Sequence, residues 1–204
     1  KMLFLSRDAA AFAIAKPLIH TPDTHWQYAS GTSNIISRIV REASGGSTAD
    51  VVRLLNHQLF NPLGMTKALI EPDTSGNLIG SSYMYATARD WAQFGQLYLQ
   101  DGVWQGKRLL PEGWVKYSST PTLAAAKGQY AAHFWSNGGI NSTKQNRPFP
   151  SLPGDLYYAA GYKGQRVIII PSHQLVIVRL GWTDAASPQN METMVSEILM
   201  AKTN

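Results

Sequence analysis

The sequence contains no cysteine, and this removes several classes of chemistry at once. Without a thiol there is no cysteine nucleophile, no disulfide and no cysteine-ligated zinc site. No run of about 18 apolar residues occurs, so the sequence predicts no membrane span. The formal net charge is only +5, and the basic residues form no run of five or more. We therefore expect no nucleic-acid partner.

Histidine chemistry has little support either. The chain has five histidines, which form no His-x-x-x-His pair, and it has no Gly-x-Ser-x-Gly elbow. We therefore expect no metal and no cofactor. These histidines are His20, His25, His57, His133 and His173. His57 falls on a predicted helix, while His133 falls with Trp135 in a candidate strand that either faces a cleft or packs inside.

Helical patterns come first along the chain, and strand patterns follow them. We expect helices over 2–14, 33–43, 47–59, 87–100 and 188–201, with a further short one starting at 111–114. Hairpins are expected around Gln105–Gly106 and between 166–170 and 175–180, with other strands at 128–135 and 157–160. This order predicts an α+β chain with an antiparallel sheet. It divides the chain into a mainly helical region, 1–118, and a region of strands with a closing helix, 119–204.

Two of the helices carry a clear starting signal. Ser47 precedes Asp50 by three residues, and Thr87 precedes Asp90 by the same spacing. Both pairs read as acidic variants of a capping box. Asn61-Pro62-Leu63-Gly64 is expected to stop the helix that begins near Ser47, because proline and glycine both interrupt helices.

The first candidate for chemistry is the segment Trp26-Gln27-Tyr28-Ala29-Ser30, which lies just before a predicted helix. A phenol with a pKa near 10 needs a neighbouring cation before it can take the proton of a serine hydroxyl near neutral pH. Tyr28 is a phenol of this kind in a loop, and its assignment to that role is implied by the family resemblance given below. The alternative is a buried tyrosine whose hydroxyl is simply hydrogen-bonded.

The second candidate is Gly161-Tyr162-Lys163-Gly164-Gln165, which follows the strand pattern at 157–160. Glycines at a sheet edge let the backbone approach a ligand closely, and backbone N–H groups there can stabilise an oxyanion. The alternative is a bulge or tight bend of the sheet with no chemical role.

Both segments resemble motifs of the penicillin-recognising serine hydrolases. That family includes class C β-lactamases, esterases, DD-peptidases and 6-aminohexanoate-dimer hydrolases. The segments Pro62-Leu63-Gly64-Met65 and 85–91, which reads Tyr-Ala-Thr-Ala-Arg-Asp-Trp, support the resemblance, and it covers nearly the whole chain. The resemblance implies a β-lactamase/transpeptidase-like fold, and the pattern around Tyr28 is most similar to the 6-aminohexanoate-dimer hydrolase type.

The resemblance also implies roles for individual residues. Tyr28 would be catalytic, and Ser30 stands where the family often has asparagine. The N–H of Tyr162 would help to bind the oxyanion, within roughly 10 Å of the Tyr28 hydroxyl if both act on one acyl group. The other expected members of the oxyanion and substrate-binding set are Gly161, Gly164, Gln165 and Trp135.

Two family motifs are absent from the sequence. None of the nine lysines has a serine three residues before it, so there is no Ser-x-x-Lys, and Lys-Thr-Gly is missing as well. Without the strand lysine a β-lactam carboxylate would lose a charged partner, so β-lactamase activity is less favoured than esterase or amidase activity. In the family the nucleophile lies well before the tyrosine motif. We therefore expect this chain to be a C-terminal part of one incomplete catalytic domain, inactive alone.

The function expected from the resemblance is hydrolysis of an amide or ester through an acyl-enzyme. The expected partners are a small-molecule substrate and the missing N-terminal segment of the same protein. A periplasmic or secreted bacterial location is favoured by the family alone. One alternative is a non-catalytic binding or sensor protein of the same fold, and another is a stable structural unit without activity. An upstream Ser-x-x-Lys would discriminate between them.

Overall fold

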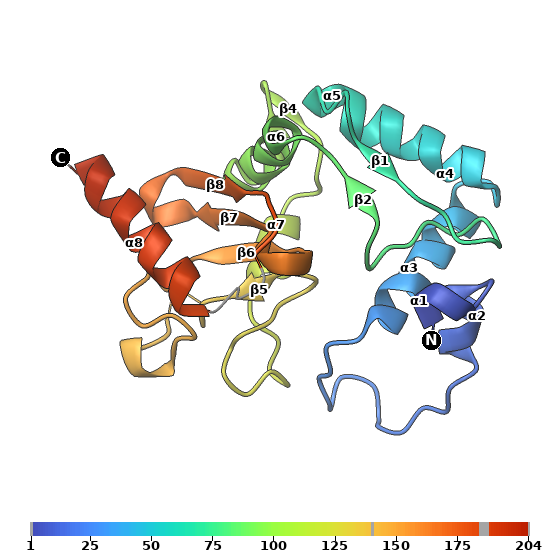
Figure 1. The fold of residues 1–204 in the computed structure, drawn as a ribbon, viewed down its shortest axis with the longest axis horizontal. Helices are drawn as coiled ribbons and strands as arrows, with labels where there is room; N and C mark the ends of the chain where they lie inside the picture. The colour runs from blue at the N-terminus through green and yellow to red at the C-terminus, as the bar shows by residue number, and fades with distance from the viewer. Residues whose placement is uncertain (1, 140, 184–187, 204) are drawn as a thin grey trace. The chain divides into compact units, whose positions relative to one another are not determined.

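The computed structural model describes residues 2–139, 141–183 and 188–203 (Figure 1). The chain forms two compact units, unit 1 over Lys1–Asp90 and unit 2 over Trp91–Asn204. The predicted regions 1–118 and 119–204 divide the chain by its pattern of elements rather than by compactness, and they stay a prediction. Helices combine with antiparallel strands, as the predicted α+β class requires.

Unit 1 begins with two short helices instead of the single helix predicted over 2–14. They are α1 (Met2–Leu5) and α2 (Ala9–Ile14). Asp8 between them is extended, and its carboxylate accepts a hydrogen bond from the Ala11 N–H at 2.8 Å. The prediction was wrong because Asp8 acts as an N-cap, which starts a new helix rather than continuing an old one.

The next two helices are α3 (Ser30–Ala43) and α4 (Thr48–Leu55). The capping box of Ser47 and Asp50 at the start of α4 is confirmed. The predicted stop before Asn61 was wrong, since the chain continues through a π-helical turn, Asn56–Phe60, into α5 (Asn61–Leu63). The wider turn accommodates Pro62, which has no N–H to donate. Gly64, with φ 74°, then ends the helix in the left-handed conformation.

The rest of unit 1 is a two-stranded sheet and the loop that it supports. Strands β1 (Leu69–Ile70) and β2 (Met84–Tyr85) pair antiparallel. Between them the Asp73 carboxylate accepts hydrogen bonds from the N–H groups of Ala9 (2.9 Å) and Asn77 (3.0 Å). Asp73 therefore fastens the start of α2 to the loop.

Unit 2 is built on a four-stranded antiparallel sheet in the order β5-β6-β7-β8 (Figure 1). Its strands are β5 (Trp135–Ser136), β6 (Tyr157–Ala160), β7 (Arg166–Ile170) and β8 (Leu175–Arg179). The predicted β7–β8 hairpin is confirmed. The strand predicted over 128–135 was wrong, because the chain turns back between Ala131 and Phe134 (2.8 Å, N to O), and His133 adopts a positive φ of 66°.

Helices cover both faces of this sheet, which makes unit 2 a three-layer structure. On one face, Tyr158, Ile168 and Ile170 pack with residues of α8 (Pro188–Thr203). On the other face, Tyr157, Val167 and Ile169 pack with residues of α6 (Ala88–Leu99) and α7 (Trp114–Ser119). Because neighbouring residues of β6 and β7 point to opposite faces, both strands are buried on both sides.

Helix α6 starts at the predicted capping box and lies close to the sheet. The Thr87 hydroxyl accepts from the Asp90 N–H at 3.1 Å, and an Asp90 oxygen accepts from the Thr87 N–H at 3.0 Å, so this prediction is confirmed. Farther along, a β-carbon placed on Gly95 would come within 2.6 Å of Val176 and 3.1 Å of Val167. Only glycine fits where the helix crosses the strands. The predicted hairpin at Gln105–Gly106 is also present, as β3 (Val103–Trp104) and β4 (Lys107–Arg108).

A buried asparagine holds the long loop between β5 and β6. Asn137 is fully buried, and its amide nitrogen donates to the carbonyl oxygens of Phe149 (3.0 Å) and Pro153 (2.9 Å). Its amide oxygen accepts from the Phe149 N–H at 2.8 Å. The loop includes one 3-10 turn, Lys144–Asn146. The side-chain bonds of Asn137 thus replace backbone hydrogen bonds within the loop and hold the segment that leads into β6.

Candidate functional site

Tyr28 lies in the loop that leads into α3. Its side chain is 58% exposed, so it does not have the burial that the structural alternative requires. Ser30 is the first residue of α3, and the extended Ala29 forms the N-cap position between them. The phenol therefore projects from the backbone just ahead of a helix. Its catalytic role stays a prediction.

A residue outside the predicted site fixes the first turn of α3. The Asn34 side chain is 1% exposed, and its amide donates to the Ser30 carbonyl at 2.8 Å and to the Ser81 hydroxyl at 3.1 Å. These bonds tie the helix start to the loop before β2. Asn34 is a positioning residue for the segment that carries Tyr28. An asparagine four residues beyond Ser30 on a predicted helix was the available sequence signal.

The segment Gly161–Gln165 forms the tight turn between β6 and β7. Gly161 is extended, and its N–H donates to the Gln165 carbonyl at 2.8 Å. Lys163 and Gly164 both have positive φ, 57° and 84°, as the two central residues of a type I′ turn do. The turn matches the structural alternative of a tight bend. A bend and a ligand contact are compatible, so the roles of Gly161, Tyr162, Gly164 and Gln165 stay predictions.

Arginine side chains stiffen this turn. Arg166 donates to the Gln165 carbonyl at 2.8 Å. Arg179, at the end of β8, donates to the Gly164 carbonyl at 2.7 Å and also to the Thr183 hydroxyl. The turn is thereby fastened to the chain that follows β8. A backbone held in this way is suited to present hydrogen-bond donors at fixed positions.

The direction of the backbone groups along β6 points to a donor that the sequence reading missed. In an antiparallel sheet, successive residues direct their N–H and C=O groups to opposite neighbours. The Leu156 carbonyl accepts from the Asn137 N–H on the β5 side (2.9 Å), whereas the Gly161 N–H faces Gln165 on the β7 side. By this alternation, Ala160 directs its N–H toward the β5 side of β6.

That side of Ala160 is open among the described residues. The last pair between β5 and β6 joins Trp135 to Tyr158, and the turn at His133 leads the chain away from β6. Ala160 is exposed. Its N–H is therefore a candidate oxyanion donor beside the proposed Tyr162. Sequence alone could not identify it, because the assignment depends on where β5 ends.

Trp135 occupies a packed position rather than an open one. It is half-buried, its ring centroid lies 6.4 Å from that of Tyr158, and it contacts the cluster beneath α8. Burial raises the pKa of both Tyr157 and Tyr158, so their hydroxyls stay protonated near neutral pH. The role of Trp135 in substrate binding stays a prediction.

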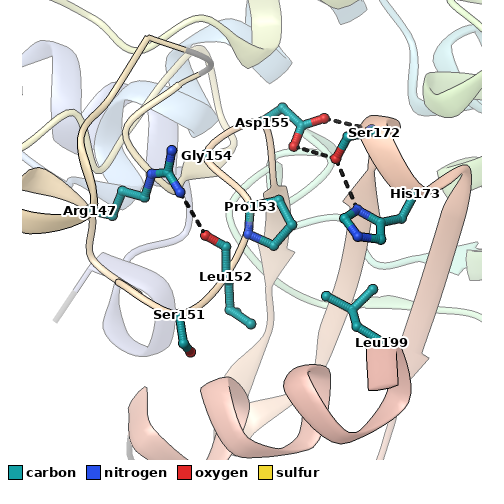
Figure 2. A pocket seen from close by; sticks show the side chains of 9 residues that line it. All are labelled: Arg147, Ser151, Leu152, Pro153, Gly154, Asp155, Ser172, His173 and Leu199. Carbon is teal, nitrogen blue, oxygen red and sulfur yellow. Dashed lines mark hydrogen bonds between the residues drawn. The ribbon is translucent and has the colours of Figure 1, made fainter. Parts of the chain in front are cut away.

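A cavity of about 490 Å³ lies at the other end of the sheet from the β6–β7 turn (Figure 2). Asp155 precedes β6, and Ser172 and His173 lie between β7 and β8. The Asp155 carboxylate accepts from the Ser172 N–H (2.6 Å) and hydroxyl (2.9 Å), and that hydroxyl lies 3.0 Å from His173 Nδ1. In a catalytic triad the histidine stands between the serine and the carboxylate. Here Ser172 stands between Asp155 and His173. The three residues therefore form a hydrogen-bonded turn and lack the order of a catalytic triad.

The described residues also contain neither a metal site nor a membrane-spanning helix. No group of three or more His, Asp or Glu lies close enough to hold a metal ion within the described ranges. No helix in that part of the chain has the length and apolar character needed to cross a bilayer.

A sheet with helices on both faces, together with a mainly helical unit that carries an exposed tyrosine, defines a β-lactamase-like protein. The chain belongs to the Beta-lactamase family, whose model matches residues 3–190. This membership confirms the predicted family resemblance and its α+β fold.

Relatives of known sequence agree with this family. The chain is 26% identical over 172 residues to the 6-aminohexanoate-dimer hydrolase of Paenarthrobacter ureafaciens, covering 78% of this chain and 40% of that enzyme. It is 25% identical over 177 residues to an uncharacterized protein of Alkalihalophilus pseudofirmus, covering 78% of this chain and 52% of that protein. The chain thus spans about half the length of these relatives or less.

Solved structures show the same fold. A Bacillus anthracis protein, provisionally assigned as a 6-aminohexanoate-dimer hydrolase, superposes with a TM-score of 0.67 at 24% identity, over 89% of this chain and 44% of that one. A β-lactamase from Mycobacterium bovis gives 0.66 at 15% identity, over 90% and 66% of the two chains.

Proposed function

We infer that the protein to which this chain belongs is a serine-dependent hydrolase of amides or esters that works through an acyl-enzyme. The observation that carries the proposal is the end of β6. There a stiffened turn and the open N–H of Ala160 present backbone donors at an exposed edge. Family membership and the exposed Tyr28 support the same reading.

The proposed mechanism divides its groups between this chain and an upstream segment. An upstream Ser-x-x-Lys would supply the nucleophile and a cation. Tyr28 would take the serine proton as the acyl bond forms and return it to the leaving group. Backbone N–H groups of Ala160 or Tyr162, with the N–H of the nucleophile itself, would stabilise the negative oxygen.

The proposed substrate is a linear amide or ester rather than a β-lactam. The relative named for its action on the 6-aminohexanoate dimer favours an amide of that kind. The missing Lys-Thr-Gly removes the lysine that would pair with a β-lactam carboxylate.

The first test uses a fluorophosphonate probe on the full-length protein. We expect one upstream serine, within a Ser-x-x-Lys, to be labelled. Tyr28→Phe should lower the rate of acylation roughly 10²- to 10⁴-fold, the usual loss when a general base is removed. Tyr117→Phe is the matched control, because Tyr117 is similarly exposed, at 66%, but lies on α7.

Two results would count against the mechanism. A Tyr28→Phe enzyme at full rate would remove Tyr28 from it. A full-length protein that neither binds the probe nor hydrolyses 4-nitrophenyl acetate would favour the non-catalytic binding member of the fold.

A further inference from the structure

Two large aromatic side chains are exposed where the β6–β7 turn meets the chain after β8. Tyr162 is 72% exposed and Trp182 is 70% exposed. Their ring centroids lie 5.5 Å apart with an interplanar angle of 85°, which is an edge-to-face contact. We call these two rings the Tyr162–Trp182 pair.

The backbone beneath the pair is held by polar bonds from both segments. The Thr183 N–H donates to the Lys163 carbonyl at 3.1 Å. Arg179 bridges the same two segments through the Gly164 carbonyl and the Thr183 hydroxyl. A single exposed aromatic residue needs no explanation. Two that are brought together by bonds outside the core form a pre-organised surface, which lowers the entropy lost when a ligand binds.

Lys163 completes the arrangement. Its ammonium lies 5.0 Å from the Trp182 ring centroid and 5.7 Å from that of Tyr162, within the range of cation–π attraction. A single cation thus lies within this range of both rings. Most of the ring surface remains exposed, and it is this surface that a ligand would cover.

We propose that the Tyr162–Trp182 pair binds an aromatic or extended aliphatic part of a linear substrate, with the Tyr162 ring nearer to the reacting carbonyl and the Trp182 ring farther from it. The proposal rests on the proposed function. Trp182 follows β8, whereas the Ala160 N–H lies on β6, two strands away. Neighbouring strands are about 4.8 Å apart, so β8, which leads to Trp182, lies roughly 10 Å from β6. That is the length of about three extended residues, so an acetyl group bound at Ala160 is too short to reach Trp182.

The test compares a long and a short ester on the full-length protein. The substrates are 4-nitrophenyl 6-phenylhexanoate and 4-nitrophenyl acetate, and the measured quantity is the ratio of their kcat/KM values. In Trp182→Ala we expect this ratio to fall roughly 3- to 10-fold, the loss of one aromatic contact, chiefly through a higher KM for the long ester. Trp182→Phe should restore most of the ratio.

The control is Tyr117→Ala, which removes an exposed ring that also lies beside a tryptophan, Trp114, at 5.8 Å. Its ratio should equal that of the wild type. An unchanged ratio in a folded Trp182→Ala enzyme would overturn the proposal, and so would a fall of the same size in Tyr117→Ala.

A binding measurement separates this proposal from the proposed function. Calorimetric titration with 6-phenylhexanamide requires no hydrolysis. If the protein hydrolyses neither ester, the proposed function fails, and a roughly 3- to 10-fold weaker affinity in Trp182→Ala would still support the pair as a binding surface. Equal affinity in wild type and Trp182→Ala would overturn it.

Discussion

Unit 1 and unit 2 differ in the kind of contact that stabilises each of them internally. The two apolar clusters described above, one on each face of the sheet, lie in unit 2. In unit 1 the apolar side of α3 is largely open, with Ile39 58% exposed, and side-chain bonds to backbone connect the parts. Examples are Asp73 to the Ala9 N–H, and Ser37, whose hydroxyl donates to the Leu78 carbonyl at 2.6 Å. Among the described residues, unit 1 buries fewer apolar side chains than unit 2, so each polar contact matters more there.

The largest effect is expected in the core of unit 2. Ile169 is fully buried between the sheet and α6. Ile169→Ala should lower the free energy of unfolding by about 4 kcal/mol, because it removes buried methyl groups and leaves a cavity. Ile39→Ala should cost less than about 1 kcal/mol. Urea denaturation of the full-length protein measures both, and equal losses would contradict the contrast between the units.

A smaller effect is expected at the polar tie of unit 1. Asp73→Ala leaves the Ala9 and Asn77 N–H groups without this acceptor, and it should cost about 2 kcal/mol. Glu71→Ala, at an exposed neighbouring position, is the control and should be nearly neutral. Hydrogen exchange should locate the added opening in α2 and the loop at 73–77. A uniform change across both units would argue against a local tie.

The smallest effect is expected in the pH dependence of folding stability, through His133. Burial lowers the pKa of His133. Below about pH 6.5, where an unfolded histidine gains its proton, the unfolded state binds more protons than the folded one. Stability therefore falls as the pH drops through 6.5 toward the folded pKa, and it rises with pH over the same range. His133→Asn should lose less stability between pH 7.5 and pH 5, since asparagine tolerates the positive φ there. His57→Asn, at an exposed histidine, should behave as the wild type.

The features predicted correctly from the sequence depend on neighbours within a few residues. The capping boxes at Ser47 and Thr87 and the hairpin at Gln105–Gly106 are of this kind. Each is specified by a short pattern whose geometry hardly depends on the rest of the chain.

Some errors were local, such as the Asp8 N-cap that divides the helix predicted over 2–14, and others came where distant contacts decide. His133 gave no sign of a positive φ, so the strand over 128–135 was predicted too long. Asn137 bonds to backbone groups 12 to 16 positions away, and no short sequence pattern predicts such contacts. The proposed role of the Ala160 N–H as an oxyanion donor depends on where β5 ends. The proposed roles of Tyr28 and Tyr162 came from family resemblance and remain to be measured.

Gly95 has a consequence for how relatives of this chain can vary. Because a β-carbon at this position would collide with Val176 and press on Val167, the glycine sets the spacing between α6 and the sheet. A relative with alanine here must carry a smaller residue opposite it or a displaced helix. Among relatives, substitutions at positions 95 and 176 should therefore occur together. The residues at these two positions would then indicate how closely α6 packs on the sheet.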